Sequence, residues 1–273
     1  MSLLEITDLR VSFPGRGWRA KPVEVLHGVS LDVAHGETVG LVGESGSGKT
    51  TIGRAVLGLL KPSGGTIGFN GETISALAPR QRRRLAKDIQ VVFQDPYTSL
   101  NPSLTVGDIL AEPLVVQGAT GKDARARVRT LLDQVGLPAD AAERLPREFS
   151  GGQRQRVAIA RALAPQPKLI VCDEPVSALD LSTQERVLDL FIDIQRSTGV
   201  AYLFISHDLT VVRHISHRVA VLYRGDLVEM GPAAQVTSEP AHEYTRKLLL
   251  AAPVADPSLQ RERREARRNL AAA

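Results

Sequence analysis

The stretch GESGSGKTT at positions 43–51 follows the apolar run TVGLV, and the helix-like stretch TTIGRAVLGLL begins inside it. Its first eight residues fit the pattern G-x-x-x-x-G-K-[ST], in the strand-to-helix context that this pattern requires. Glycines let backbone N–H groups turn inward and hold phosphate oxygens at the start of a helix. Lys49 can neutralise the β and γ phosphates, and the Thr50 hydroxyl can bind Mg²⁺. The stretch therefore predicts a site for a nucleoside triphosphate such as ATP.

The predicted phosphate-binding residues are Gly43, Glu44, Ser45, Gly46, Ser47, Gly48, Lys49, Thr50 and Thr51. An ordinary glycine-rich turn would explain the glycines, but it has no use for a Lys-Thr pair at a helix start. A dinucleotide-binding fingerprint fails, because its third glycine position, counted from Gly46 and Gly48, holds Thr51. The loop alone leaves kinases, GTPases, helicases and transport ATPases open.

Short strand-like runs alternate with helix-like stretches along the chain, which is typical of an α/β fold around a largely parallel sheet. The runs are SLDV, TVGLV, TIGF, IQVVF, KLIVC, AYLFI and VAVLY. The segment 96–160 has helical patterning without a strong strand run, and we expect a helical insertion there. A tail begins at about residue 233, with a helix expected over HEYTRKLLLAA and an arginine-rich end.

Composition excludes several classes of site. Cys172 is the only cysteine in the sequence, so neither an intrachain disulfide nor a cysteine-based metal or iron–sulfur site can form. The basic excess behind the net charge of +4 is concentrated at 79–84 and 261–268, without interleaved aromatic residues, so we expect solvated faces and no nucleic-acid partner. The apolar runs are too short to span a membrane and no signal peptide opens the sequence, so we expect the chain to stay in the cytosol.

The run LIVCDE at 169–174 ends an expected strand with two carboxylates. Because adjacent strand residues project to opposite faces, Asp173 and Glu174 can do different work. Asp173 suits Mg²⁺ coordination, and Glu174 suits polarisation of an attacking water as general base, a role that typically contributes about 10²- to 10⁴-fold in rate. The alternative is that the two acidic residues merely end a strand. The phosphate loop in the same chain makes this alternative less favoured.

The run FSGGQ at 149–153 precedes the helix-like stretch RQRVAIARAL. Ser150 and Gln153 match a capping box, which is a purely structural interpretation. Because a glycine inside a helix costs about 1 kcal/mol relative to alanine, Gly151 and Gly152 indicate that something approaches the backbone closely. A second phosphate, bound by the Ser150 hydroxyl and the Gly152 amide at the positive end of the helix, would do so.

Together, FSGGQRQR, KLIVCDEP and SALD resemble the signature, Walker B and D-loop of ATP-binding cassette (ABC) proteins, and the resemblance covers roughly residues 3–230. It implies an α/β fold with a P-loop NTPase (RecA-like) core, an antiparallel β subdomain and a helical insertion subdomain. It also implies that two ATP-binding domains pair head to tail. The signature segment 149–153 of one domain would then face the ATP held by the phosphate loop of the other.

The same resemblance gives roles to single residues. Gln94 resembles the Q-loop glutamine that reaches Mg²⁺ and the attacking water, Asp180 the D-loop aspartate at the dimer interface, and His207 the switch histidine at the γ-phosphate. If the family resemblance is set aside, Gln94 is only an amide at the end of an expected strand, and His207 is only a histidine at the end of another. An aromatic residue is expected to stack on adenine; Phe13 resembles that position, and Trp18 is the alternative.

The stretches FQDPYTSLNP and EPAHEYTRKLLLAAPVADP resemble the ATPase subunits of bacterial oligopeptide and dipeptide importers. That resemblance implies an ATP- and Mg²⁺-dependent ATPase with an ATP-binding domain at 1–233 and a C-terminal extension at 234–273. It implies a peripheral position at the cytoplasmic face of the inner membrane. The implied partners are a second ATPase subunit, identical or homologous, two transmembrane permease subunits and an extracytoplasmic solute-binding protein.

Peptide uptake follows from resemblance only, and nickel or another small solute is an alternative. A nucleic-acid-associated cassette ATPase is a rival from another class, as is a P-loop kinase for a small molecule. The kinase would leave FSGGQ without a purpose. Proteins of the nucleic-acid class usually carry two cassettes, a long coiled-coil insertion or cysteine-rich zinc modules, none of which this sequence shows.

Overall fold

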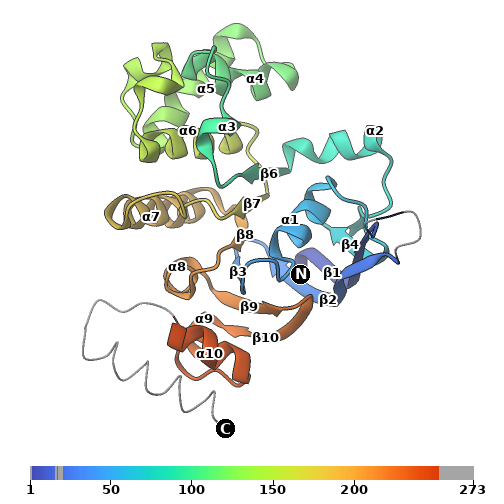
Figure 1. Ribbon diagram of the computed structural model, residues 1–273. Coiled ribbons are helices and arrows are strands. Elements are labelled where there is room, and N and C mark those ends of the chain that lie inside the picture. Colours follow the sequence, from blue (N-terminus) through green and yellow to red (C-terminus); the bar gives the residue numbers. More distant parts are fainter. Residues whose placement is uncertain (1, 16, 18–20, 252–273) are drawn as a thin grey trace. The chain divides into compact units, whose positions relative to one another are not determined.

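The computed structural model describes residues 2–15, 17 and 21–251 (Figure 1). Its contacts divide the chain into two units. The phosphate-loop unit consists of the described residues within Ser2–Val33 and Thr38–Ala76, and of residues 204–251. The helical unit consists of Ala34–Glu37 and Leu77–Leu203, and it contains the whole segment 96–160. Trp18 and the arginine-rich run 261–268 lie outside the described residues.

The first sheet of the phosphate-loop unit has the strand order β2-β1-β4-β5. Its strands are β1 (Ser2–Phe13), β2 (Val23–Ala34), β4 (Gly64–Phe69) and β5 (Glu72–Thr73), and β4 runs antiparallel to both neighbours. This confirms the antiparallel β subdomain. The sequence patterns did not predict β1, because its register with β4 shifts between Thr7 and Arg10 and the bulge breaks the alternation of buried and exposed residues.

The second sheet of this unit has the order β10-β9-β3, followed by residues 204–205 of β8 (Ala201–Ile205). Strand β3 (Thr38–Val42) runs parallel to β9 (Arg218–Tyr223), which pairs antiparallel with β10 (Asp226–Pro232). All five residues of β3 are buried, as expected for a parallel strand covered on both faces. The helices of the unit are α1 (Lys49–Leu57), α8 (Leu209–Ile215), α9 (Ala233–Ser238) and α10 (Glu243–Ala251).

In the helical unit, residues 201–203 of β8 are followed in the sheet by β7 (Leu169–Asp173) and β6 (Ile89–Val92), and β6 and β7 are parallel. The helices are α2 (Pro79–Arg82), α3 (Pro96–Ser99), α4 (Val106–Val116), α5 (Gly121–Gln134), α6 (Gly151–Leu163) and α7 (Leu181–Thr198). Three 3-10 helices join them, η1 (Arg83–Lys87), η2 (Ala139–Glu143) and η3 (Pro146–Glu148).

Local signals start and end the helices of this unit. Thr105 caps α4 and Thr120 caps α5, because each side chain accepts a hydrogen bond from a backbone N–H of the first turn. Helix α7 ends at Gly199, whose φ of 72° is a left-handed conformation that favours glycine. Within residues 2–15, 17 and 21–251, none of the helices is both long and apolar enough to cross a membrane.

Candidate functional site

The phosphate loop at 43–48 connects β3 to α1 inside the phosphate-loop unit. A Cβ at Gly43, where φ is 154°, would lie 2.1 Å from the Leu222 carbonyl oxygen. A Cβ at Gly48, where φ is 107°, would lie 2.6 Å from a methyl carbon of Leu26. Both positions therefore require glycine, through the backbone conformation and through the neighbouring atoms. Gly46, in contrast, has open space around it.

Lys49 begins α1 and is only 5% exposed. Its Nζ donates hydrogen bonds to the carbonyl oxygens of Gly43 and Glu44, each over 2.8 Å. No side chain among the described residues caps α1, and its first turn holds no acidic residue. The first backbone N–H groups of α1 and its dipole therefore favour an anion at the loop.

The Ser47 hydroxyl gives independent support for a phosphate here. Its Oγ is buried and has no hydrogen-bond partner among the described residues. Because a buried hydroxyl without a partner costs free energy, an oxygen of a bound phosphate would stabilise it. Thr50 and Thr51 are half-buried at the start of α1, and the Thr50 hydroxyl is the type of oxygen ligand that Mg²⁺ takes together with phosphate. The loop thus fits the phosphates of a nucleotide.

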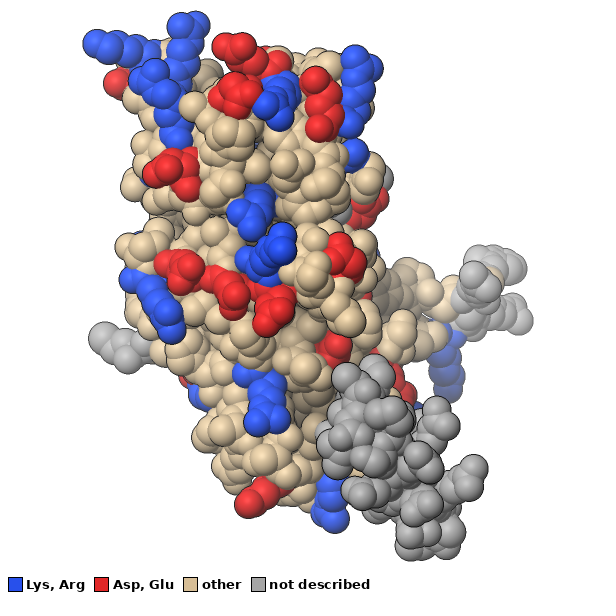
Figure 2. Space-filling view, turned by 90° about the vertical axis from the view of Figure 1, so that its left-hand side faces the viewer, with Lys and Arg blue, Asp and Glu red and all other residues tan. Residues whose placement is uncertain are grey.

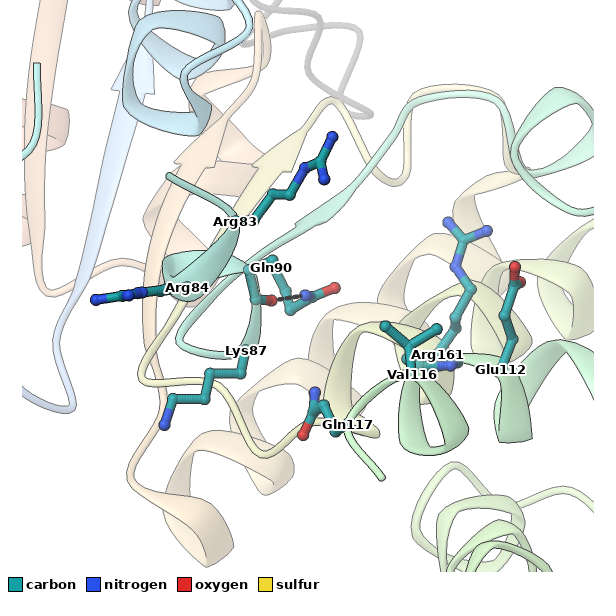
Figure 3. Close-up of a pocket in the computed structure, with 10 residues that line it drawn as sticks. Arg83, Arg84, Lys87, Gln90, Glu112, Val116, Gln117 and Arg161 are labelled. Atoms are coloured by element: carbon teal, nitrogen blue, oxygen red, sulfur yellow. Dashed lines mark hydrogen bonds between the residues drawn. The ribbon is translucent and has the colours of Figure 1, made fainter. Parts of the chain in front are cut away.

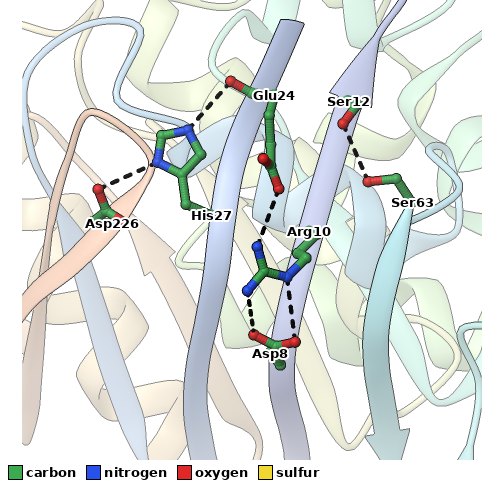
Figure 4. A network of polar contacts seen from close by, with 7 residues as sticks. All are labelled: Asp8, Arg10, Ser12, Glu24, His27, Ser63 and Asp226. Carbon is green, nitrogen blue, oxygen red and sulfur yellow. Dashed lines mark hydrogen bonds and ion pairs between the residues drawn. The ribbon is translucent and has the colours of Figure 1, made fainter. Parts of the chain in front are cut away.

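The turn between β9 and β10 supports the phosphate loop. Arg224 and Gly225 form this two-residue turn with φ of 47° and 88°, as in a type I′ hairpin. The Gly225 N–H donates to the Ser47 carbonyl over 3.1 Å, and the Gly225 carbonyl accepts from the His27 N–H over 3.1 Å. The His27 ring is in turn 3.3 Å from the Asp226 carboxylate, as Figure 4 shows. Strand β2 thereby holds the turn against the loop.

Two further predicted residues lie in the same unit. Phe13 ends β1 and is 39% exposed, so its ring is accessible for stacking on a base. The adenine contact stays a prediction for Phe13, and its alternative Trp18 falls outside the described residues. His207 is exposed after the end of β8, between the buried Ser206 and the cap of α8 at Asp208.

In the helical unit, β7 ends at Asp173, and Glu174 follows with φ of 50°. Left-handed backbone is uncommon for a residue other than glycine and persists where the surroundings enforce it. The Ser177 N–H and hydroxyl fix the turn by donating to the Glu174 carbonyl over 3.3 and 3.0 Å. The expectation of strand alternation was therefore wrong for this pair, since a turn sets the direction of the Glu174 side chain.

Ser150 is the N-cap of α6. Its Oγ accepts a hydrogen bond from the Gln153 N–H over 3.3 Å, and Gln153 Oε1 accepts from the Ser150 N–H over 2.9 Å. The capping box is confirmed. Both residues are exposed, so the Ser150 hydroxyl lies at the surface of the unit.

The two glycines of the signature segment have different surroundings. A Cβ at Gly152 would lie 2.3 Å from Thr183 Cγ2 of α7, whereas a Cβ at Gly151 would meet Leu179 at an ordinary 3.6 Å. A ligand was expected to explain the glycines by approaching the backbone. The close neighbour of Gly152 is a side chain of the same unit, which gives this glycine a packing reason of its own. The phosphate contact stays a prediction.

Asp180 has a task inside the chain as the N-cap of α7. Its Oδ1 accepts hydrogen bonds from the Thr183 N–H over 3.0 Å and from the Ser182 hydroxyl over 2.8 Å. Hydrogen bonds from the Thr183 side chain and N–H, and from Ser182, lower the pKa of Asp180 to about 2. The carboxylate is therefore ionised at neutral pH and starts α7.

Gln94 is exposed after the end of β6, and the segment that follows it is tied to the signature helix. The Arg154 guanidinium of α6 lies 3.8 Å from the centroid of the Tyr97 ring. Arg161, also of α6, donates a hydrogen bond to the Ser99 carbonyl. The sequence patterns did not single out these contacts, because they join residues far apart in the chain.

A groove of about 660 Å³ lies in the helical unit (Figure 3). Its charged lining residues are Arg83, Arg84, Lys87, Glu112 and Arg161. The first three come from η1, Glu112 from α4 and Arg161 from α6. Burial lowers the pKa of Arg161, an effect that the nearby Glu112 opposes. Val116 of α4 also lines the groove and is 82% exposed.

A glycine-rich loop between a buried parallel strand and an uncapped helix, together with a second parallel strand that ends in a carboxylate, defines a P-loop NTPase. The family of ABC transporters matches residues 26–177. The chain belongs to this family and is an ABC ATPase.

Solved structures and relatives agree with this assignment. The chain is similar to cbiO1 from Clostridium perfringens, part of the ABC transporter complex cbiONQ, with a TM-score of 0.78 and 26% identity over 87% of this chain and 91% of that one. It is also similar to the dimeric ATP-binding cassette MJ0796 bound to ADP and Pi, with a TM-score of 0.75 and 29% identity over 84% and 98% of the two chains.

Among curated proteins, the chain is 54% identical over 267 residues to the glutathione import ATP-binding protein GsiA of Escherichia coli (strain K12). The protein of that name from Shigella boydii serotype 4 is also 54% identical over 267 residues. The alignment covers 96% of this chain and 43% of each relative, so the chain spans less than half of their length.

Proposed function

We propose that this chain is the ATP-hydrolysing part of an ABC importer for peptides. The geometry of the phosphate loop supports a nucleotide site. Lys49 favours phosphate, and so do the Ser47 hydroxyl and the start of α1, which have no partner and no side-chain cap among the described residues. The solute follows from the relatives that are 54% identical and named for glutathione import, because glutathione is a tripeptide. Nickel or another small solute is the rival, and the same ATPase machinery would serve it.

Catalysis would rest on positioning and on stabilisation of charge. We assign Lys49 to the β and γ phosphates, His207 to the γ-phosphate and Phe13 to adenine. Glu174 would act as the general base that orders and polarises the attacking water, and its left-handed backbone suits a residue held in a fixed direction.

Mg²⁺ would be held by Thr50, Asp173 and Gln94. Their hydroxyl, carboxylate and amide oxygens are ligands of the kind that Mg²⁺ prefers, and the bound ion would neutralise charge on the phosphates.

Two copies of the chain would form two complete sites. Each copy carries a phosphate loop and a signature segment, and the exposed Ser150 hydroxyl is accessible to a nucleotide held by a partner. The solved dimer of MJ0796 supports pairing of such cassettes. Asp180, beside the start of α7, would lie at this interface. Pairing with a homologous second subunit is the alternative outcome.

Transmembrane permease subunits, working with an extracytoplasmic solute-binding protein, would be driven from the cytoplasmic face of the membrane. We propose that their docking segment binds in the groove of the helical unit. Four basic residues and one acidic residue line this groove, namely Arg83, Arg84, Lys87, Arg161 and Glu112. An acidic segment with apolar side chains would match these charges and the exposed Val116 of α4. In co-purification with the permease, Arg84→Glu should reduce the yield of complex, whereas Arg129→Glu, an exposed charge on α5 outside the groove, should not.

The catalytic assignment is tested with Glu174→Gln. This variant should bind ATP as the unmodified chain does, with hydrolysis reduced about 10²- to 10⁴-fold, the usual contribution of a general base. Near-normal hydrolysis would remove Glu174 from that role.

The solute is tested by reconstituting the chain with its permease and binding protein in liposomes. ATP-dependent uptake of labelled glutathione or dipeptides is the expected result. Stimulation of ATP turnover by Ni²⁺, without stimulation by peptides, would contradict peptide import and favour the rival.

A nucleic-acid-associated role is disfavoured by the surface charge. On the face shown in Figure 2, acidic side chains are interspersed among the basic ones. Tight DNA or RNA binding in a filter assay, falling steeply with salt, would reverse this conclusion.

A further inference from the structure

The C-terminal helix α10 contacts the phosphate loop through one tyrosine. The backbone N–H of Glu44 donates a hydrogen bond to the Tyr244 hydroxyl over 2.9 Å, across 200 positions of sequence. Both residues belong to the phosphate-loop unit. We propose that Tyr244 is a positioning residue for ATP binding, which fixes the orientation of the peptide group between Gly43 and Glu44.

That peptide group is held at both ends. At one end, the Glu44 N–H donates a hydrogen bond to the Tyr244 hydroxyl. At the other end, the Gly43 carbonyl accepts a hydrogen bond from Lys49 Nζ over 2.8 Å. The carbonyl of Glu44 accepts a second hydrogen bond from Lys49, also over 2.8 Å. Because Gly43 has no Cβ, its backbone is freer to rotate than that of other residues. The two opposed hydrogen bonds select one orientation of the peptide.

This orientation determines where the lysine lies. With the Glu44 N–H directed to α10, the two carbonyls stay directed to the Lys49 ammonium and hold it over the loop. Without the tyrosine hydroxyl, the N–H loses its partner and Lys49 alone holds the peptide group. The peptide can then turn more easily, and a turn takes the Gly43 carbonyl away from Lys49. The loss therefore falls mainly on the binding of phosphates.

Packing holds Tyr244 itself in place. The side chain is 8% exposed, and its ring stacks on that of Tyr223 with centroids 4.1 Å apart and the planes at 33°. It belongs to an apolar cluster with Val42, the residue that precedes the phosphate loop, and with Leu209 of α8. These ring contacts survive removal of the hydroxyl, so Tyr244→Phe isolates the hydrogen bond. Burial raises the pKa of Tyr244, and the charge of Glu44 adds to this effect, whereas the hydrogen bond from the Glu44 N–H lowers the pKa. The net shift is upward, so the phenol is neutral at neutral pH.

The start of α10 is anchored to β10. The Glu229 carboxylate accepts hydrogen bonds from the N–H groups of Ala241 and His242 over 2.8 and 3.1 Å. Burial alone would raise the pKa of Glu229, but hydrogen bonds, these two among them, and the charge of His242 together outweigh it, and the pKa lies below the ordinary value. The carboxylate is thus charged at neutral pH, and α10 presents Tyr244 from a fixed support.

The proposal rests on the ATP binding of the family and is independent of the solute. Tyr244→Phe is titrated with a fluorescent ATP analogue and assayed for hydrolysis. We expect the Kd for ATP to rise about 3- to 10-fold, which corresponds to one lost hydrogen bond. The kcat at saturating ATP should stay within about twofold, and the ratio of ATP to GTP affinity should not change, because the loop contacts phosphates and not the base.

Two variants serve as controls. Tyr202→Phe removes the hydroxyl of another buried tyrosine, which donates to the Phe191 carbonyl over 3.2 Å in the helical unit, and it should leave the Kd unchanged. Tyr223→Phe keeps the ring that stacks on Tyr244 and should also leave the Kd unchanged. A Kd for Tyr244→Phe within twofold of the unmodified chain, or a rise matched by Tyr202→Phe, would overturn the proposal.

If Tyr244→Phe folds poorly, hydrogen exchange on the unmodified chain decides the question. The Glu44 amide should be protected in the absence of nucleotide because of its bond to Tyr244. Exchange at the rate of an unstructured chain would overturn the proposal. Failure of the unmodified chain to bind ATP would instead contradict the family function, so the two failures are distinguishable.

Discussion

Two glycine-rich helix starts, those of α1 and α6, show how similar sequences serve different ends. Helix α1 begins after the phosphate loop without a side-chain cap, and Ser47 beside it is buried without a partner among the described residues. Helix α6 begins with a complete capping box in which Ser150 and Gln153 already satisfy two donors. The first start leaves its backbone donors to a ligand, whereas the second offers mainly an exposed serine hydroxyl.

The glycines differ in the same way. At Gly43 and Gly48 the backbone conformation and close neighbours exclude a side chain, as part of the cradle itself. At Gly152 the neighbour is Thr183, so the glycine serves the packing of α6 on α7. A glycine-rich motif therefore does not by itself mark a phosphate contact.

The largest effect that separates the two helix starts is expected at Gly43. Gly43→Ala places a Cβ 2.1 Å from the Leu222 carbonyl, so the loop must move, and ATP affinity should fall about 100-fold or more. Gly46→Ala, at φ of 79° with open space around it, has only backbone strain and should lose less than about 10-fold. Equal losses in an ATP titration would show that the neighbours of Gly43 do not matter.

The next effect concerns the signature helix. Gly152→Ala should destabilise the protein by about 1–3 kcal/mol through overpacking against Thr183. Gly151→Ala should be neutral or stabilise by up to about 1 kcal/mol, since its Cβ has room. Urea unfolding measures both. Thr183→Ser removes the methyl group that meets Gly152 and should restore stability to Gly152→Ala; no restoration would contradict the packing role.

A pair of serine variants should give crossed results. Ser150→Ala removes a cap and should lower stability by about 1 kcal/mol, with the ATP affinity of a single protomer unchanged. Ser47→Ala removes a hydroxyl without a partner in the described part of the chain and should leave stability nearly unchanged, while ATP affinity falls about 3- to 10-fold. Thermal melts measure the stability of both variants, and ATP titrations measure their affinity. If both variants lost the same property, the two helix starts would not differ in role.

The smallest effect concerns a third helix start, that of α7. The pKa of Asp180 is about 2, below the usual value, so its ionised form is favoured by folding. The contribution of this cap to stability is therefore present above about pH 4 and is lost as the pH falls through about 2. A carboxyl titration followed by NMR should show this low midpoint. A midpoint near 4 would mean that Asp180 does not cap the helix in solution.

The features predicted from sequence are those that neighbouring residues determine. The phosphate loop, the capping box at Ser150 and the buried strand β3 each depend on residue types within a few positions. Strand β1 was missed because a bulge interrupts its alternation. Strand β10 was missed because it is half-exposed along most of its length and shows no apolar pattern.

Other features depend on tertiary contacts that spacing does not reveal. The left-handed backbone of Glu174 arises in a turn that Ser177 closes, and the neighbour of Gly152 comes from another helix. Tyr244 reaches the phosphate loop from 200 positions away. A tyrosine in a C-terminal helix carries no local signal for such a contact.

The pairing of one phosphate loop with the signature segment of a partner is tested most directly by mixing two inactive variants, Lys49→Ala and Ser150→Arg. In a head-to-tail dimer, a mixed pair has one site with both defects and one site with none. Random pairing should then restore ATP hydrolysis to about a quarter of the unmodified level. If loop and signature act within one protomer, every site keeps a defect, and a mixture as inactive as its components would contradict the pairing.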